Sequence, residues 1–539
     1  VYAVRNNAGA TAGILHKAST SGWTTTGVTM AETLFFDGGG GGTGRALPLE
    51  GDTVTGASSS ATATVHRVIV HSGAVGTNDA EGYIVLTGVA GGPFTDTEDL
   101  TESATKFADA SGANSAFAFS INGTYRFISK NFFGGSTTFR AYGCNGVDPG
   151  FEIDENGVVS PILHPSTSLG GQPASNAPFL VVEHRNYLWF AFPGGSLQHS
   201  VIGQPLTWNG FLGAAEFGIG DEITGIRPTV GGVLVVVTER ESRGMFGQTD
   251  ANFELRLIGE KTGGRLYSVQ SIDTIYTLDD LGITSIARAE SFGDFVGSTV
   301  SQLVQPVVIA ERANVNDSSI VRSSNQYRVY FNDASALVMY VPSIGSANDR
   351  RGLTPRTRVE FGLLSYPLVV NRIYNAEDAD GMERSYFAST DGFVYEDRIG
   401  RNFDGAEIEA YVRLAFNQVG TPSIRKRFRR VDLELAAQNA VTIQFTADIS
   451  YGAPEVSSSS SSIDISDIPE LDIFGTGGFW DDSNWDEFIW DGQAINTARA
   501  GLTGSGENIG FVIFNSSAKA EPWIMQGITL QYDLRRLQR

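Results

Sequence analysis

Among the side chains that could take part in catalysis, carboxylates are the most numerous in this sequence. The chain of 539 residues has 60 Asp and Glu, and most glycosidases need only two such groups beside the bond that they cleave. With so many carboxylates, some pair falls at a suitable distance by chance. Asp221-Glu222 and Asp481-Asp482 are adjacent, but adjacent side chains of a strand point to opposite faces. Glycoside hydrolysis therefore stays an alternative without a distinguished catalytic pair.

Other catalytic and binding motifs are missing. His66 and His71 do not form a His-Glu-x-x-His pair, and the chain has no Gly-x-Ser-x-Gly elbow. The single cysteine, Cys144, rules out an intrachain disulfide and a multi-cysteine zinc site, and we expect it in a glycine-rich turn. No Gly-Lys-Ser/Thr follows the run Gly38–Gly42, so we expect a flexible loop there. We expect no catalytic residue, cofactor or metal.

The charge is acidic and uneven. Lys and Arg number 38 against 60 Asp and Glu, a net charge of −22. Such a surface argues against a protein that grips nucleic acid through phosphate contacts, and suits one that nucleic acid slides past. From Ala440 to Leu530, 13 acidic residues stand against only Arg499 and Lys519, a net −11. We expect some of these carboxylates to face any channel that the chain lines.

A basic cluster lies shortly before that acidic stretch. Arg425, Arg427 and Arg429 alternate with other residues, so in a strand they share one side. Arginine suits bidentate pairing with carboxylates. The sign reversal predicts a head-to-tail contact between subunits through these three arginines, with two separately solvated faces as the alternative.

Three tryptophans recur at intervals of five among carboxylates: Trp480, Trp485 and Trp490. Large aromatics this close together usually form a packed corner or a subunit contact. We predict an aromatic contact patch, and a platform for sugar rings is the sharper alternative.

The elements that must position these residues are short strands. Tyr187–Phe192 and Ser196–Ile202 flank a Pro-Gly-Gly turn, and Ser385–Ser389 and Phe393–Asp397 flank Thr-Asp-Gly. No amphipathic helix exceeds about two turns, and Leu433–Ala437 is predicted as a strand. The pattern predicts an all-β fold with a β-propeller-like body, of which about five blades fit between residues 179 and 397. A pair of β-sandwiches is the alternative.

Composition divides the chain into four parts. Residues 1–44 are predicted as N-terminal strands of the main body, and 45–117 as a small inserted β-domain that follows the glycine run. Residues 118–430 form the propeller-like body, and 431–539 form a C-terminal β-region with a serine-rich loop and the tryptophans. No apolar run approaches the roughly 18 residues that a membrane-spanning helix needs.

Several short motifs, in their order along the chain, resemble the tail nozzle, or tail-hub (tail tubular), proteins of short-tailed bacteriophages. They are His184–Phe192, Leu197–Pro205 with Thr207-Trp208, Phe217–Gly225, Gly231–Thr238 and the closing Trp523 to Arg536 stretch. The segment Val54–Thr64 is similar to a small β-module inserted in many phage structural proteins.

The resemblance implies a non-enzymatic structural protein of the virion, assembled in the host cytoplasm. It implies a homohexameric ring below the portal and adaptor, which forms the channel for genome ejection and docks fibres or spikes. Double-stranded DNA would pass without being specifically bound. Such proteins usually start with a further N-terminal segment, so we expect one upstream of Val1. A carbohydrate-binding propeller and a propeller glycosidase acting on host surface glycans remain the alternatives.

Overall fold

The fold is described from a computed structural model of the chain. It covers all residues except 20–21, 136–137, 164–176, 230, 273, 289–294, 342–358, 379, 401, 438–440, 452–469, 474–495, 518–522 and 536–539. Almost every element is a strand, and the described residues contain one short α-helix, α1 (Gln305–Glu311). None of the described helices is long and apolar enough to cross a membrane. The chain divides into two compact units, Val1–Asp397 and Arg398–Arg539.

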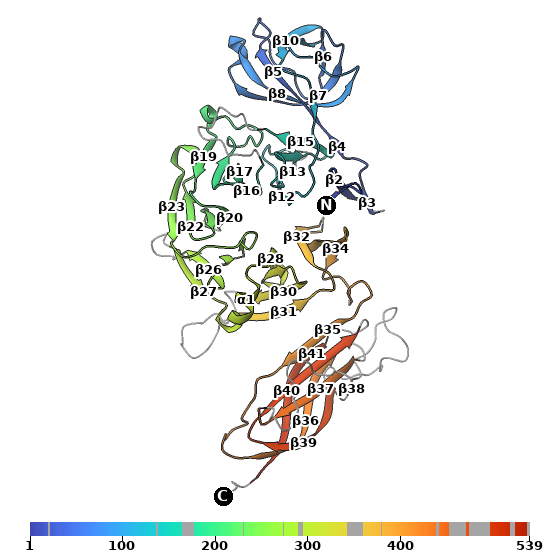
Figure 1. The fold of residues 1–539 in the computed structure, drawn as a ribbon, viewed down its shortest axis with the longest axis vertical. Helices are drawn as coiled ribbons and strands as arrows, with labels where there is room; N and C mark the ends of the chain where they lie inside the picture. The colour runs from blue at the N-terminus through green and yellow to red at the C-terminus, as the bar shows by residue number, and fades with distance from the viewer. Residues whose placement is uncertain are drawn as a thin grey trace. The chain divides into compact units, whose positions relative to one another are not determined.

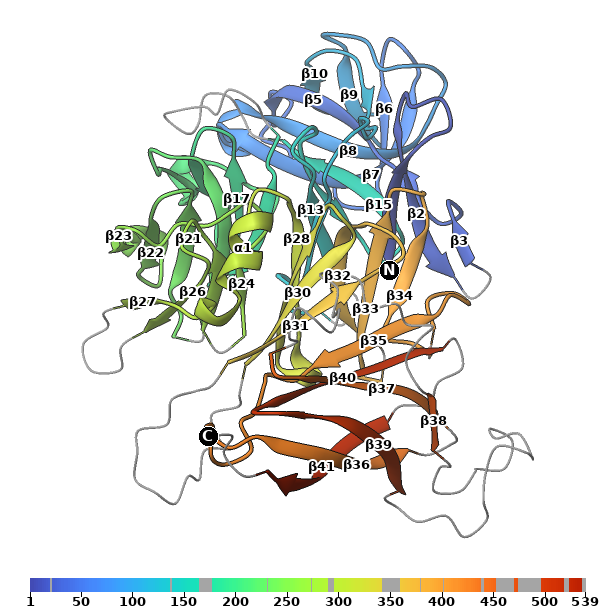
Figure 2. The same cartoon turned by 60° about the horizontal axis from the view of Figure 1, so that its bottom comes forward.

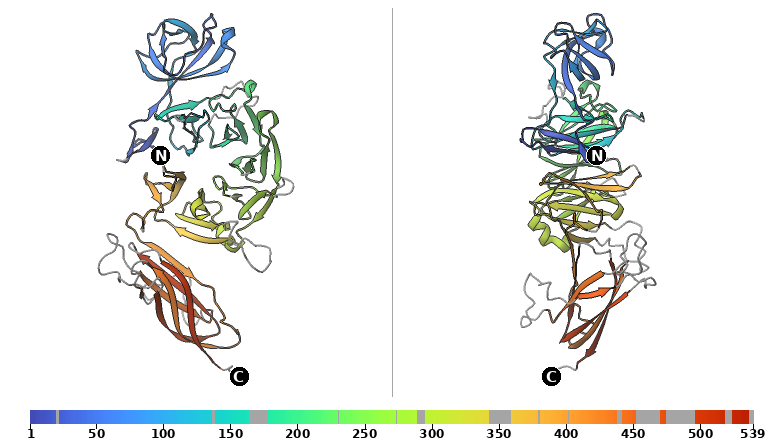
Figure 3. Two further views of the ribbon diagram at one scale, coloured as in Figure 1. Left: turned by 180° about the vertical axis from the view of Figure 1, so that it is seen from behind. Right: turned by 90° about the vertical axis from the view of Figure 1, so that its right-hand side faces the viewer.

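Six antiparallel sheets follow one another around a common centre in the first unit (Figures 1 and 3). In chain order their strands are β12 (Arg126–Lys130), β13 (Arg140–Cys144), β14 (Gly150–Ile153) and β15 (Val158–Ile162); β16 (Leu180–His184), β17 (Tyr187–Phe192), β18 (Ser196–His199) and β19 (Ala215–Gly218); β20 (Ile223–Pro228), β21 (Leu234–Thr238), β22 (Ser242–Phe246) and β23 (Glu254–Gly259); β24 (Gln270–Ser271), β25 (Ile275–Leu278), β26 (Ile283–Arg288) and β27 (Phe295–Thr299); β28 (Val315–Val321), β29 (Gln326–Phe331), β30 (Ser335–Tyr340) and β31 (Glu360–Ser365); and β32 (Val370–Glu377), β33 (Glu383–Ser389) and β34 (Val394–Asp397).

This arrangement confirms the predicted all-β class with a β-propeller body. Each sheet is a meander in which successive strands pair, and its first strand is the innermost. Five of the sheets lie between Leu180 and Asp397, the number expected for that stretch. The hairpin turns have the expected chemistry, since Gly392 of the Asp-Gly turn has a φ of 85°.

The N-terminal strands complete and extend the ring. β1 (Tyr2–Asn6), β2 (Gly13–Ser19) and β3 (Gly22–Thr24) form a small sheet, and side chains of β1 pack on the first propeller sheet. β4 (Thr29–Met30) pairs in parallel with β15 as a fifth strand of that sheet. The first blade thus combines strands from both sides of an insertion.

That insertion is a closed barrel. Its strands are β5 (Glu32–Gly39), β6 (Thr53–Gly56), β7 (Thr62–Ser72), β8 (Ala80–Ala90), β9 (Asp99–Glu102), β10 (Thr105–Ala110) and β11 (Ser115–Ala116). The sheet runs β10-β9-β6-β7-β8-β5-β11, and a further pairing of β10 with β5 closes it. Closure leaves the six barrel strands without a free edge and encloses a core that includes Val54, Ile84 and Phe107.

The barrel begins earlier than the sequence indicated. β5 starts at Glu32, whereas the inserted domain was predicted to start at residue 45. The glycine run closes the end of β5 instead of preceding the module as a flexible loop. A Cβ on Gly40 would lie 2.4 Å from the Val75 carbonyl oxygen, and one on Gly41 would lie 2.5 Å from that of Lys106. Close backbone packing therefore requires these glycines.

The barrel is joined to the propeller by apolar and charged contacts. Ile69, Tyr83 and Val85 of the barrel share a core cluster with propeller residues such as Tyr142 and Phe190. A polar network lies beside it, in which the fully buried Glu152 of β14 accepts a hydrogen bond from Arg140 at 2.6 Å. Arg67 of β7 lies 3.8 Å from the same carboxylate.

The second unit is a two-layered sandwich (Figure 2). One sheet has the order β35-β40-β37-β38 and the other β39-β36-β41. Their bounds are β35 (Ile408–Arg413), β36 (Lys426–Ala437), β37 (Val441–Ile449), β38 (Glu470–Ile473), β39 (Asn496–Gly506), β40 (Ile509–Ser517) and β41 (Trp523–Leu534). Leu433, Phe445 and Ile513 belong to the core between the sheets.

This unit begins at Arg398, not after Arg430 as the sequence division had it. The reason is that β35 pairs with β40, a strand about 100 residues later, so the segment around residues 408–413 belongs to the sandwich and not to the propeller. The predicted strand at Leu433–Ala437 is confirmed as the end of β36.

Candidate functional site

The candidate site is a large cavity at the centre of the propeller. Its volume is about 2090 Å³, and it is lined mainly by the inner strands β12, β16, β20, β24, β28 and β32, together with β1 and β33. Five arginines line it, against two glutamates: Arg5, Arg126, Arg227, Arg322, Arg372, Glu377 and Glu383. This balance is the reverse of the chain's, which has 60 acidic against 38 basic residues. The cavity is therefore a basic region in an acidic protein.

One carboxylate, Asp317 of β28, organises the cationic wall. Arg126 of β12 donates two hydrogen bonds to it, at 2.8 and 3.1 Å. The backbone amides of Ser318 and Ile373 donate to the same carboxylate at 2.8 and 3.0 Å. Burial alone would lower the pKa of Arg126, but Asp317 raises it above its ordinary value. The acceptor capacity of Asp317 is thus already used.

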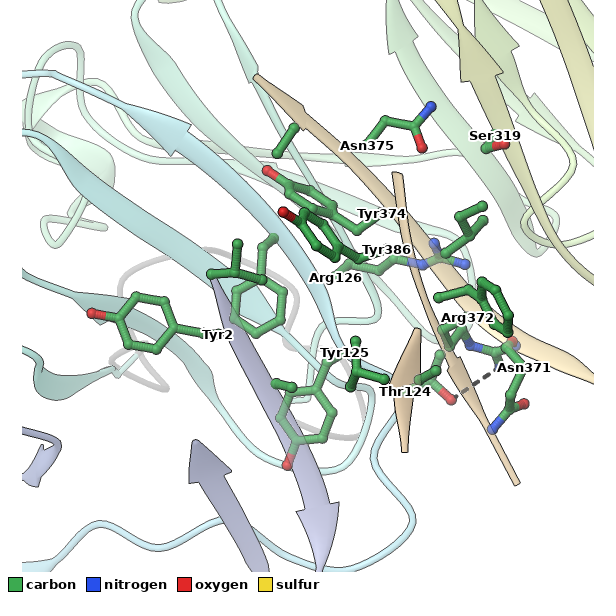
Figure 4. A pocket seen from close by; sticks show the side chains of 18 of the residues that line it. Tyr2, Thr124, Tyr125, Arg126, Ser319, Asn371, Arg372, Tyr374, Asn375 and Tyr386 are labelled. Atoms are coloured by element: carbon green, nitrogen blue, oxygen red, sulfur yellow. Dashed lines mark hydrogen bonds between the residues drawn. The ribbon is translucent and has the colours of Figure 1, made fainter. Parts of the chain in front are cut away.

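Arg372 of β32 also packs on the ring of Tyr267. Its guanidinium donates to the carbonyl oxygens of Asn316 and Asn371 at 2.7 and 2.6 Å and to Thr124 Oγ1 at 3.3 Å, the bond drawn in Figure 4. The centroid of the Tyr267 ring lies 4.2 Å from the Arg126 guanidinium carbon and 4.8 Å from that of Arg372. Burial lowers the pKa of Arg372.

Arg227 of β20, like Arg372, donates only to neutral acceptors. It donates to Gln270 Oε1 at 3.1 Å and to the carbonyl oxygen of Ile226 at 3.4 Å, both neutral acceptors. Gln270 is itself held by the Ser318 carbonyl at 2.8 Å. Burial, with Arg126 close by, lowers the pKa of Arg227 to about 10. Arg227 forms no salt bridge with any residue that the structure describes.

The two glutamates of the wall are occupied by backbone and arginine contacts. Glu377 and Glu383 are opposite each other on β32 and β33. Arg322 donates to Glu377 at 3.1 Å, and the amides of Arg322 and Ser323 donate to Glu383 at 2.9 and 3.0 Å. These carboxylates hold the turn after β28, so their contacts do not resemble those of a free acid and base at a glycosidic bond.

Tyrosines supply the aromatic part of the wall. Tyr374 and Tyr386 are opposite each other on β32 and β33, and Figure 4 shows both with Tyr2 and Tyr125 around the cavity. Burial raises the pKa of Tyr125 to about 12 and also raises that of Tyr374. The cavity therefore combines neutral phenols with guanidinium groups, a surface suited to polar or anionic molecules.

The predicted interface arginines lie elsewhere, in the second unit. Arg425, Arg427 and Arg429 are all exposed, whereas Lys426 and Phe428 are buried, so the predicted alternation holds over these residues. Arg429 donates to Asp533 at 2.7 Å, and Arg425 donates to the Ser505 carbonyl at 3.2 Å. Among the described residues Arg427 has no such partner. Their role as a subunit contact stays a prediction.

Other residues singled out in the sequence have varied outcomes. Trp480, Trp485 and Trp490 lie outside the described residues. Cys144 lies on β13, fully buried, and not in a turn, and burial raises the pKa of its thiol. His66 is buried beside Asp154, with Nε2 at 3.8 Å from a carboxylate oxygen. The described residues contain no cluster of side chains that could hold a metal ion.

The arginine cluster was missed because nothing local marks it. Arg126 and Asp317 are separated by 191 residues, and each stands alone in an ordinary strand pattern. Only the ring closure brings them together. The available signal was weak: an arginine within a short apolar strand, as in Ile223–Pro228, is unusual enough to suggest a functional or structural partner.

Comparisons with known proteins add fold likeness only. No protein-family model matches the chain, and no curated protein is similar to it. The β-propeller domain of Myceliophteria thermophila Cps50 (Swd1) is 13% identical, with 51% of this chain and 82% of that chain covered and a TM-score of 0.34.

Streptogramin B lyase is 9% identical, with 68% of this chain and 98% of that chain covered and a TM-score of 0.32. A BBS1N structure in complex with ARL6DN is 12% identical, with 50% and 76% covered and a TM-score of 0.31. At such scores the likeness carries no argument about activity, and the propeller assignment rests on the sheets themselves.

Proposed function

We propose that this chain is a structural subunit of a short-tailed bacteriophage tail, a nozzle or hub protein. Copies of it assemble as a ring that forms the channel for genome ejection and a platform for other tail proteins. The order of the short motifs from Val54 to Arg536 supports this proposal, because that order resembles the nozzle family. The activity proposed is assembly, and no catalytic step is assigned to the chain.

The observation that carries the proposal is the exposed basic face of β36. Arg425, immediately before β36, and Arg427 and Arg429 at the start of that strand are all exposed. The stretch from residue 440 to 530 carries 13 acidic residues against two basic ones. A head-to-tail ring requires two different surfaces on each subunit that are complementary to each other. Most of these carboxylates lie outside the described residues, so the acidic surface is part of the proposal. Arginine pairs with carboxylates bidentately, which also fixes orientation.

The net charge supports the channel. A net of −22 per subunit is multiplied around a ring, and such a lumen repels the phosphates of passing DNA. Weak contact with the wall allows double-stranded DNA to move through without sticking, whereas a basic lumen would hold it.

The test is the oligomeric state of the purified full-length chain. Native mass spectrometry and negative-stain electron microscopy should show rings with a continuous pore, six-fold by the family resemblance. The triple variant Arg425→Glu, Arg427→Glu and Arg429→Glu should leave monomers. The matched control carries the same charge change on exposed arginines of the first unit: Arg185→Glu, Arg240→Glu and Arg256→Glu.

The control should form rings like the parent chain. A parent chain that remains monomeric at every concentration would contradict the proposed function. If the triple variant still forms rings, the three arginines are not part of the subunit interface, and another surface must form it.

A further inference from the structure

The central cavity has more positive charge than its own carboxylates can balance. Three guanidiniums, those of Arg126, Arg227 and Arg372, line the cavity. Burial and the nearby positive charge of Arg126 lower the pKa of the other two. Asp317 is the carboxylate at this wall, and its oxygens already accept from Arg126 and from two backbone amides. The cluster therefore keeps an excess of cationic donors.

Unused donors remain at this wall. The Nε atoms of Arg126 and Arg372 are buried and have no hydrogen-bond partner among the described residues. Arg227 has only an amide and a carbonyl as acceptors. A buried cation without a counter-charge is costly, so such positions are usually paired or occupied by an anion.

We infer that this cavity binds a small molecule through an oxyanion group, with Arg227 as the principal contact. Arg126 and Arg372 supply the surrounding positive potential. A planar guanidinium matches the paired oxygens of a carboxylate or a phosphate, which are the two anions of this chemistry.

The cavity can hold more than the anionic group. Its volume of about 2090 Å³ exceeds the roughly 300–1,000 Å³ of ordinary ligand pockets, so a larger molecule that carries the anion has room. Tyr374 and Tyr386 offer phenol faces and hydroxyls at the same wall. This inference is independent of the proposed tail function, because it concerns the interior of one propeller and not the contacts between subunits.

The experiment is isothermal titration calorimetry on the full-length chain at constant ionic strength, with chloride as the background anion. The probes are inorganic phosphate, glucuronate and glucose. Binding of glucuronate without phosphate identifies a carboxylate ligand, and the reverse identifies a phosphate ligand. Glucose lacks the anion and should not bind detectably.

The variant Arg227→Gln should weaken binding of the preferred anion by about tenfold or more, because one charged hydrogen-bonding group is lost. Arg227→Lys keeps the positive charge but lacks the planar guanidinium with its paired N–H donors, so it should give an intermediate loss of affinity. Arg256→Gln is the matched control, since Arg256 is an exposed arginine of the first unit that pairs with Glu254 and does not line the cavity; its affinity should equal the parent's.

The thermal stability of Arg227→Gln tests the same inference when binding is too weak for calorimetry. Thermal unfolding without added anion should show Arg227→Gln at least as stable as the parent, because an uncompensated buried cation has been removed. The inference is overturned if phosphate and glucuronate both fail to bind at concentrations of about 10 mM. It is also overturned if the parent and Arg227→Gln bind the anion with equal affinity. A marked loss of stability in Arg227→Gln would also count against it, since Arg227 would then be a structural residue.

Discussion

The inserted barrel and the second unit are both small all-β bodies, and they treat their strand edges in opposite ways. In the barrel, β10 pairs with β5, so each of the six strands from β5 to β10 has a neighbour on both sides. In the second unit, the described pairings leave β41 with β36 alone and β35 with β40 alone. These outer strands also expose apolar side chains, including Tyr411 at 68% and Ile524 at 63%.

The difference shows where this chain can meet other chains. A closed barrel offers no backbone donors or acceptors to a visiting strand, whereas an open edge is a ready template for pairing. The exposed arginines of β36 lie in the same open-edged unit. Both features favour the second unit over the closed barrel as the location of the proposed contact between subunits.

The largest expected effect tests whether the two bodies are energetically separate. Leu433→Ala in the second unit and Phe107→Ala in the barrel each remove a fully buried side chain. Each should cost about 3–4 kcal/mol of unfolding free energy in its own unit. Hydrogen exchange followed by mass spectrometry in urea should localise the loss.

Leu433→Ala should accelerate exchange in peptides from residues 398–535 and leave the barrel peptides unchanged, and Phe107→Ala should do the reverse. If either variant destabilised both regions equally, the chain would unfold as one cooperative body and the division at Asp397 would lose its energetic meaning.

The next largest expected effect is a different pH dependence of stability in the two units. Burial lowers the pKa of His71, His184 and His199 from 6.5 to about 4. A histidine with a lowered folded pKa stays neutral when folded but takes up a proton when unfolded below pH 6.5. Unfolding is therefore favoured as pH falls from 6.5 towards 4, by up to about 3 kcal/mol for each such group.

All six histidines of the chain precede residue 200, so the second unit has none. Urea unfolding at pH 7 and pH 4.5 should show this histidine-linked loss in the first unit only. His199→Gln should reduce the pH dependence of that unit. An unchanged pH dependence in this variant would show that carboxylates, and not the buried histidines, control acid stability.

The smallest expected effect concerns a surface ion pair. Arg429 and Asp533 are 2.7 Å apart, with 51% and 58% of their side chains exposed. Arg429→Gln should cost less than about 1 kcal/mol, because exposed pairs contribute little. Chemical denaturation of the second unit would measure it. A larger loss would mean that the triple charge reversal on β36 disturbs the fold as well as the subunit contact.

The parts of the fold that the sequence predicted are those encoded locally. The Pro-Gly-Gly turn after Phe192 and the Asp-Gly turn at Gly392 each specify a hairpin within a dozen residues, and both hairpins are present. The start of the barrel was missed because β5 begins before the glycine run and ends within it, and the run is needed for packing against residues 75 and 106. Glycines required for close approach and glycines in a flexible loop look the same in a sequence.

The candidate site was hidden for a different reason. Asp317 of the fifth sheet meets Arg126 of the first sheet only because ring closure brings these strands together, and the backbone amide of Ile373 in the last sheet donates to the same carboxylate. Neither turn chemistry nor alternation specifies which arginine will have a carboxylate beside it and which will not. The excess charge at Arg227 is a property of ring closure, so it could not be found before the ring was known.

The parallel pairing of β4 with β15 sets an order of events during synthesis. β4 leaves the ribosome before any barrel strand, yet its partner strand is made only after the whole barrel has been synthesised. We expect the barrel to fold first, while β4 is still unpaired. The first blade then forms when β15 has been synthesised and pairs with β4. Because both ends of the barrel lead into the same blade, the barrel can be gained or lost between related chains without changing the number of blades.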